Sequence, residues 1–162
     1  MANPKKIKLH GWVLVLLVTM VLTSAGAAEP VKPSAGDKCP VCGMFVAKYP
    51  DWVAEIVFKD RSTVFFDGAK DLFKYYFNLN RYNPRKNKKD IATVYVTEYY
   101  YMTLIDAREA HYVIGSNVYG PMGRELIPFK SEPEAAEFLK DHRGQKVVGF
   151  KDVTPVLIES LD

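Results

Sequence analysis

Residues 52–78 decide the fold of the first half of the chain, and they read WVAEIVFKDRSTVFFDGAKDLFKYYFN. Two segments in this stretch, Trp52 to Phe58 and Thr63 to Phe66, are rich in β-branched and aromatic residues. The polar residues 59–62 separate them, as a turn separates two strands. The pattern predicts a β-hairpin.

A helix is expected directly after this hairpin. Asp67 is a residue type that favours the N-cap position. Apolar residues then recur at spacings of three and four, which predicts an amphipathic helix from Gly68 to Asn78. Its apolar side is expected to pack on the hairpin through Ala69, Leu72, Phe73 and Tyr76.

The second half of the chain repeats the order of strand, strand and helix. Ala110 to Ile114 and Glu125 to Phe129 predict two strands. Ser131-Glu132-Pro133-Glu134 is a capping box with proline in the first turn, and the helix it opens is expected to end near Gly144. The two halves together predict an α+β domain of two β-β-α units, with antiparallel sheets and the helices on one side.

Four further segments complete the secondary-structure prediction. The β-prone run from Ile91 to Asp106 is expected to break near Glu98, and the basic segment from Asn80 to Asp90 predicts an exposed loop. Lys146 to Phe150 and Thr154 to Ile158 are predicted as terminal strands.

The first 28 residues have the three parts of a secretory signal peptide. Three lysines precede an apolar run from Trp12 to Leu22, and the small residues 24–28 offer a cleavage site. The run is short for a membrane span. We therefore expect a signal peptide at 1–28, a linker at 29–36 and one domain at 37–162. An uncleaved N-terminal anchor is the alternative.

Charge excludes a polybasic surface for the exported domain. Losing the three signal-peptide lysines from the 22 basic residues leaves 19, against 19 acidic residues. Attraction to nucleic acid is therefore not expected. Membrane contact is expected only if the signal peptide is retained.

Both cysteines of the chain lie in the segment Asp37-Lys38-Cys39-Pro40-Val41-Cys42-Gly43-Met44. A disulfide between Cys39 and Cys42 would close a very small ring, which stabilises a fold little. A zinc ribbon needs a second pair of ligands, which the sequence does not contain. A thioredoxin-like site would follow a strand and open a helix, whereas strand-like sequence follows this motif.

Soft-metal binding fits the segment better. Cys42 and Met44 place a thiolate and a thioether on either side of a glycine, and Cu(I) prefers such ligands. Met122, in Gly120-Pro121-Met122-Gly123, is a second methionine in a glycine-flanked turn. These features predict a Cu(I) site at Cys42, Met44 and Met122, with Cys39 as a further candidate ligand. We assign Met102, in an apolar run, to the core.

The C-x-x-C-G-M segment and the later G-P-M-G turn together resemble the NosL family, accessory proteins of nitrous oxide reductase maturation. The resemblance implies a periplasmic Cu(I) metallochaperone with two β-β-α halves, similar in topology to organomercurial lyase. It places the copper ligands at Cys42, Met44 and Met122. Many members are lipoproteins anchored through a cysteine at the cleavage site, and this sequence has none there.

The implied partners are an exported cuproenzyme that receives the copper and a membrane copper-delivery complex. We expect a binding and delivery protein instead of an enzyme, because no nucleophile, base and oxyanion donor occur in a recognisable order. The alternatives are a periplasmic thiol-disulfide oxidoreductase that uses Cys39 and Cys42, and a binding domain in which they form a static disulfide. His111 is an additional ligand candidate or a structural histidine.

Overall fold

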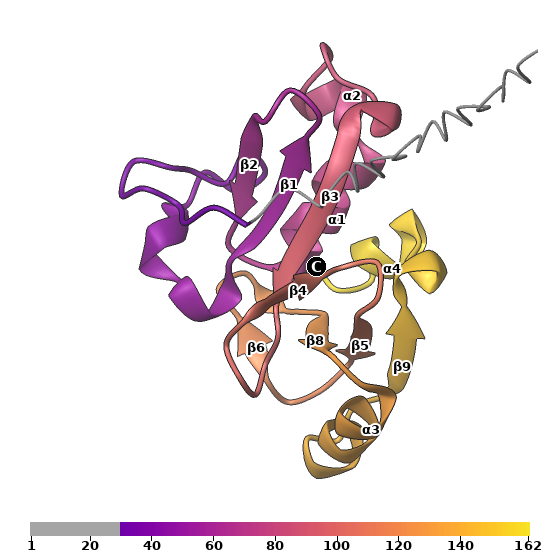
Figure 1. Cartoon of the computed structure of the whole chain (residues 1–162). Coiled ribbons are helices and arrows are strands. Elements are labelled where there is room, and N and C mark those ends of the chain that lie inside the picture. The colour runs from indigo at the N-terminus through magenta and orange to yellow at the C-terminus, as the bar shows by residue number, and fades with distance from the viewer. Residues whose placement is uncertain (1–29) are drawn as a thin grey trace, which may run out of the picture.

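The computed structural model describes residues 30–162, which form two larger antiparallel sheets, each with a helix packed on it, and one short two-stranded sheet (Figure 1). The first unit runs through two strands, a helix and two more strands. Its four strands lie in the order β2-β1-β3-β4. The elements are β1 (Ala54–Phe58), β2 (Thr63–Phe66), α1 (Ala69–Phe77), β3 (Ile91–Thr97) and β4 (Leu104–Asp106).

The second unit repeats the arrangement around its own first strand, in the order β8-β5-β9. In both units the first strand lies between the second strand and the strand that follows the helix. A short hairpin, β6 (Tyr119–Gly120) with β7 (Gly123–Arg124), is inserted between β5 and β8. The other elements are β5 (His111–Ile114), β8 (Ile127–Phe129), α3 (Glu132–Asp141) and β9 (Lys146–Gly149). The predicted α+β fold of two β-β-α units is confirmed.

Short helices connect and close these units. The predicted loop at Asn80–Asp90 contains α2 (Leu79–Tyr82) and a 3₁₀ turn, and most of it is exposed. The last element is α4, and four single 3₁₀ turns lie in the connections. Their bounds are α4 (Pro155–Glu159), η1 (Val46–Lys48), η2 (Pro50–Trp52), η3 (Lys88–Asp90) and η4 (Phe150–Asp152).

The prediction of a strand at Thr154–Ile158 is wrong, because these residues open α4. The Thr154 hydroxyl accepts a hydrogen bond from the Leu157 N–H at 3.2 Å, and Pro155 occupies the first helical position. Both are signals of a helix start. Local cap chemistry therefore overrides the β propensity of the valine and isoleucine that follow.

The long β-prone run breaks at Glu98, as predicted. The buried Glu98 carboxylate accepts hydrogen bonds from the N–H groups of Tyr100 and Tyr101, which turns the chain between β3 and β4. Met102 lies in this turn with a φ of +53° and is half exposed. The assignment of Met102 to the core is therefore wrong, because Met102 lies in a turn and not in a strand.

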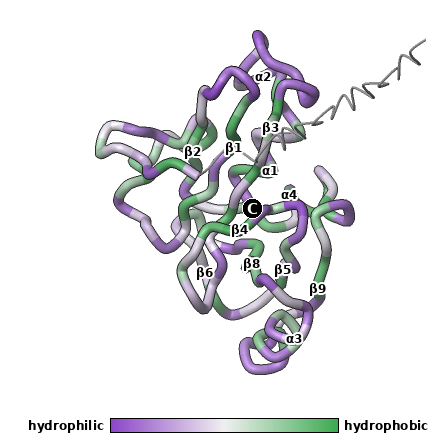
Figure 2. Tube along the Cα trace, viewed as in Figure 1, coloured by the Kyte–Doolittle hydropathy of each residue, from purple (hydrophilic) through white to green (hydrophobic). Residues whose placement is uncertain are grey.

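The main core joins both units. Figure 2 shows apolar segments concentrated along β1 and β3, whereas the region around α2 is hydrophilic. Phe73 of α1 contacts Tyr112 of β5 and Phe150 after β9, with ring centroids 5.5 and 5.1 Å apart. A smaller cluster lies under α3, centred on Phe129 and Phe138. The two units therefore fold as one body.

The segment from residue 30 to residue 36 is described without regular secondary structure. It lies against the first sheet, where the Val31 N–H donates to the Glu55 carboxylate of β1 at 3.2 Å. The predicted signal peptide lies outside the described residues. Among residues 30–162, every helix falls short of the length and apolarity that crossing a bilayer requires.

Candidate metal centre

The cysteine segment forms a closed loop held by its own backbone. The Cys39 N–H donates to the Met44 carbonyl at 2.9 Å, and the Gly43 N–H donates to the Cys39 carbonyl at 2.8 Å. Gly43 has a φ of +81°, a conformation that favours glycine. Lys38 and Phe45 form an antiparallel bridge at the base of the loop. The loop is therefore closed by its own backbone hydrogen bonds.

Two carboxylates from the start of α1 face the two thiols. The Cys39 thiol donates to Asp71 Oδ2 at 3.2 Å, and the Cys42 thiol donates to Asp67 Oδ1 at 3.1 Å. One ligand atom from each of these four residues lies within 4.8 Å of the others. We call these four residues the thiol–carboxylate cluster.

The cluster is buried at one end and open at the other. Cys39, Asp67 and Asp71 are each at most 3% exposed, and Cys42 is only partly buried. Burial, together with the hydrogen-bonded carboxylates, raises the pKa of Cys42 to about 12. Burial likewise raises the pKa of Cys39 far above its ordinary value. Both residues are therefore free, protonated thiols at neutral pH, and Cys42 is the one nearer to solvent.

Asp67 does not cap α1, contrary to the sequence-based expectation. Gly68 occupies the N-cap position, and no side chain of that residue can accept from the helix. The buried Glu125 carboxylate instead accepts from the Lys70 N–H at 2.5 Å. A Cβ at Gly68 would overlap this carboxylate, so the glycine is required for the close approach. Since Glu125 supplies the cap, the Asp67 carboxylate is left to meet Cys42.

The turn with Met122 is tied to the same end of α1. The buried Lys70 ammonium donates to the Met122 carbonyl at 2.9 Å and to the Leu161 carbonyl at 3.3 Å. Lys70 lies between Asp67 and Asp71 in the sequence. Met122 is 43% exposed, and Met44 is half-buried in the cysteine loop. The structure thus brings Cys39 and Cys42 together and docks the Met122 turn on the helix that carries their carboxylate partners.

His111 is not among the residues of the cluster. It opens β5, as expected, and pairs with Phe129 of β8 and Gly149 of β9. Of the nearby tyrosines, Tyr99 packs on the rings of Phe129 and Phe138. His111 and Tyr99 therefore both contact residues of the second unit.

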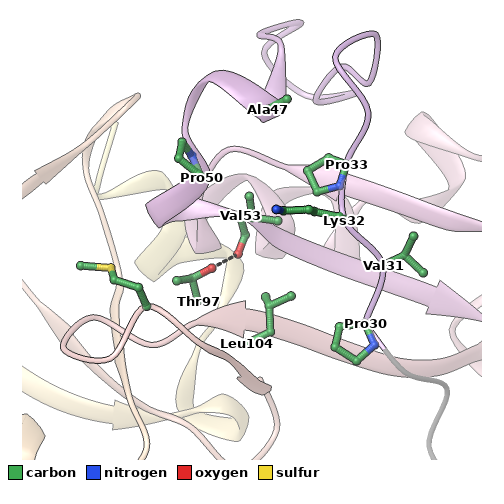
Figure 3. Close-up of a pocket in the computed structure, with 10 residues that line it drawn as sticks. Pro30, Val31, Lys32, Pro33, Ala47, Pro50, Val53, Thr97 and Leu104 are labelled. Carbon is green, nitrogen blue, oxygen red and sulfur yellow. Dashed lines mark hydrogen bonds between the residues drawn. The ribbon is translucent and has the colours of Figure 1, made fainter.

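An apolar pocket of about 350 Å³ lies away from the cluster (Figure 3). Residues 30–33 form one wall, and the segment around Pro50 and the β3–β4 turn form the others. The Thr97 hydroxyl at its floor donates to the Val53 carbonyl at 2.8 Å. The lining includes Met102 but no cysteine, and its only charged member is Lys32. None of the four residues of the thiol–carboxylate cluster lines it.

Sequence reasoning missed Asp67 and Asp71 as members of the site. A signal was present, because two acidic residues flank the start of the predicted helix, Asp67 just before it and Asp71 in its first turn. Asp71 is a charged residue in a buried turn of the helix, which is an unusual position for a carboxylate. What the sequence did not show was that the cysteine loop, 25 and 32 residues away, would lie against this end of the helix.

The donor set suits a metal cation. Asp67 Oδ2 is buried and has no hydrogen-bond partner among the described residues. Among residues 30–162, the hydrogen bonds that the two buried carboxylates of the cluster accept come from the two thiols, and a bound cation would give both groups a further partner. Thiols and thioethers are ligands for soft ions such as Cu(I). Cys39 and Cys42 supply two such thiols at this end of α1.

Comparisons with known proteins identify the family of the chain. Over 164 aligned residues the chain is 27% identical to the copper-binding lipoprotein NosL of Stutzerimonas stutzeri, covering 92% of this chain and 82% of that protein. The crystal structure of the copper chaperone NosL from Shewanella denitrificans shares the fold, with a TM-score of 0.68 at 23% identity. That match covers 79% of this chain and 97% of the other.

A second solved structure, the apo-NosL protein from Achromobacter cycloclastes, is 27% identical, with a TM-score of 0.46 over 65% of this chain and 87% of that one. The NosL family model matches residues 30–158, which is nearly the whole described chain. The chain therefore belongs to the NosL family.

Proposed function

We propose that this protein binds Cu(I) in the periplasm and delivers it to an exported cuproenzyme, in nitrous oxide reductase maturation. The observation that carries the proposal is the position of the cysteine loop and the Met122 turn, both held against the first turn of α1. Relatives named as a copper-binding lipoprotein and a copper chaperone support it.

The proposed copper ligands are Cys42, Met44 and Met122, with Cys39 as a further thiol. Cys42 is less buried than Cys39, and Met122 is exposed. A site of this kind is reached from the surface, so that a ligand from a receiving protein can attack the copper and replace one sulfur at a time. The protein acts in this proposal as a binding and delivery protein, and it catalyses no reaction.

Copper uptake replaces the thiol proton of Cys42 with Cu(I). When Cys42 binds Cu(I), a Cu–S bond forms and the S–H bond breaks, and the proton leaves to solvent. Because the thiol pKa is about 12, binding must supply the free energy of removing that proton at neutral pH. The same high pKa argues against the thiol-disulfide oxidoreductase alternative, in which the attacking cysteine must be a thiolate.

The test is an anaerobic Cu(I) titration of reduced residues 29–162 against a chromophoric Cu(I) competitor. We expect one-to-one binding that Cys42→Ser abolishes and that Met122→Ala weakens by about tenfold or more. Met102→Ala is the matched control, since Met102 is similarly exposed but lies outside the site. Wild-type affinity in a Cys42→Ser, Met44→Ala double variant would refute the assignment.

A further inference from the structure

Basic residues gather at the end of the molecule where α1 stops and α2 begins. They come from the β1–β2 turn at 59–62 and from the connection at 80–90, which lie side by side at the top of Figure 1. The Lys59 N–H donates to the Asp90 carbonyl at 2.8 Å, and Lys86 forms an ion pair with Asp60. We call the seven basic residues of these two segments the basic end: Lys59, Arg61, Arg81, Arg85, Lys86, Lys88 and Lys89.

The basic end concentrates positive charge that the balance of the whole chain conceals. Residues 29–162 contain 19 basic and 19 acidic residues. Seven of the basic but only two of the acidic residues lie in these two segments, which leaves 12 basic and 17 acidic residues elsewhere. Both local acids are engaged, Asp60 with Lys86 and Asp90 with the Asn87 N–H at 2.8 Å. The fold therefore separates charge within a domain whose net charge is close to zero.

Six cations of the basic end are available to an outside partner. All except Lys86 are exposed, and none of the six forms an ion pair within residues 30–162. Aromatic rings hold two of them in place. Lys88 Nζ lies 4.2 Å from the centre of the Tyr76 ring, and the Arg81 guanidinium lies 5.5 Å from that of Tyr82. A ring contact of this kind leaves the positive charge without an anion.

Arg81 and Lys88 line the same hollow, which has a volume of about 460 Å³. Its lining also includes Asn78, Asn80 and Asn87, and it contains no acidic residue. Cationic side chains form strong, charge-assisted hydrogen bonds to phosphate oxygens, and carboxamides can donate to them as well. The hollow therefore offers the groups that bind the phosphate of a lipid headgroup.

The chemistry of the basic end suits a bilayer surface better than a protein interface. Protein interfaces are centred on apolar and aromatic anchors. Among residues 30–162, none of the exposed large apolar side chains lies in the segments 59–62 or 80–90, and the region around α2 is hydrophilic (Figure 2). An anionic bilayer needs only cations near its surface, where each lysine or arginine strengthens binding about fivefold.

We propose that the basic end docks the folded domain on a bilayer that contains anionic phospholipids. The cysteine loop packs on the first turn of α1, and the basic end follows the last turn, about 13 Å along the helix. The cysteine loop therefore stays clear of the docking surface. Docking of this kind needs no retained signal peptide, in contrast to the sequence-based expectation for membrane contact. It does not rest on the proposed copper function.

Vesicle co-sedimentation tests the proposal on residues 29–162, which contain every described element but lack the apolar run at 12–22. One set of vesicles is phosphatidylcholine alone, and the other mixes it about two to one with anionic phosphatidylglycerol. We expect the protein to bind the mixed vesicles at about 0.01 M salt and to leave the neutral ones unbound. About 1 M salt should release it, because the Debye length falls from about 30 Å to 3 Å.

Removing two charges of the basic end should weaken binding to the mixed vesicles by about 25-fold. One variant combines Arg81→Gln with Lys88→Gln, which removes the cations of the hollow. A second combines Arg85→Gln with Lys89→Gln, so that the test remains decisive if the first variant fails to fold. Far-UV circular dichroism checks the folding of each protein.

The matched control combines Lys140→Gln of α3 with Lys146→Gln of β9, which removes two exposed charges from the second unit. It should bind the mixed vesicles nearly as well as the wild type. Equal losses in the control and in the two variants would overturn the proposal, as would equal binding to neutral and mixed vesicles.

Failure to bind the mixed vesicles at low salt would also overturn the proposal. Retention of that protein on immobilised polyglutamate would then assign the basic end to an acidic polypeptide. The copper function is tested separately, since vesicle binding without Cu(I) binding would refute that function and keep the docking surface.

Discussion

At the scale of single residues, Lys70 is the connection between the Met122 turn and the thiol–carboxylate cluster. A lysine that is 2% exposed must find partners for its ammonium group. It finds two backbone carbonyls and lies 3.5 Å from the Asp162 carboxylate. One side chain therefore holds the methionine turn and the C-terminal segment against the first turn of α1.

Lys70→Gln is expected to lower the free energy of unfolding by about 1–3 kcal/mol, since buried carbonyls lose a charged donor. It should also weaken Cu(I) binding by about tenfold, because the turn with Met122 loses its anchor. Urea unfolding and the Cu(I) competition assay measure the two effects. Lys74→Gln is the control, because Lys74 pairs only with the half-exposed Asp162; a surface pair of this kind contributes at most about 1 kcal/mol. Equal effects of the two substitutions would contradict the anchoring role.

At the scale of elements, the site depends on how α1 begins. Its N–H groups need acceptors, and Glu125 reaches them from the connection between β7 and β8. The same carboxylate accepts from the Leu126 N–H at 2.9 Å. One buried acid thus joins the hairpin that carries Met122 to the helix that carries Asp67 and Asp71.

Glu125 also makes the stability of this junction depend on pH. Burial raises its pKa from 4.5 to about 8 in the folded chain, although the two N–H groups and Lys70 lower it. The unfolded chain releases this proton near pH 4.5 and the folded chain only near pH 8. The group's contribution to stability is therefore fully present below about pH 4.5, and it is lost as the pH rises to about 8.

Glu125→Gln should remove this contribution while keeping an acceptor for the N–H groups. The free energy of unfolding of the wild type should fall, relative to that of the variant, between pH 5 and pH 8.5. Urea titrations at the two pH values measure the difference. Other groups that titrate in this range, such as Glu55, are present in both proteins and largely cancel. A difference that stays constant with pH would show that Glu125 is ionised in the folded chain throughout this range.

At the scale of the whole molecule, the two units share one core. Phe73 of the first unit lies between rings of the second, and Trp52 packs against the smaller cluster under α3. The proposed copper ligands come from both units, with Cys42 and Met44 in the first and Met122 in the second. Binding of copper to them should therefore stabilise the entire domain.

Unfolding of residues 29–162 by urea is expected to be a single two-state transition. The fluorescence of Trp52, the only tryptophan of this segment, and far-UV circular dichroism should have the same midpoint. Ser131→Ala, which removes the α3 cap, should lower both midpoints together by an amount equivalent to about 1 kcal/mol. Separate midpoints for the two probes would show that the units unfold independently.

Local chemistry explains which elements were predictable. The hairpin at residues 52–66, the capping box at Ser131 and the break at Glu98 all depend on residues within a few positions of each other, and the structure confirms them. The errors have the same origin. The segment at Thr154 was predicted to be a strand from its β propensity, but Thr154 caps a helix. Asp67 was predicted to cap α1, but the acid that accepts from the first turn is Glu125, which lies 55 residues from Lys70 along the chain.

The sequence by itself determined the family resemblance, the β-β-α order of the two halves, and the soft ligands Cys39, Cys42, Met44 and Met122 as candidates, because residue type and short spacing decide these features. Only the tertiary structure decided that Asp67 and Asp71 face the two thiols and that Lys70 holds the Met122 turn. These contacts join residues 25 to 52 positions apart. They arise from the packing of the cysteine loop and the β6–β7 hairpin on one end of α1, which no local pattern in the chain encodes.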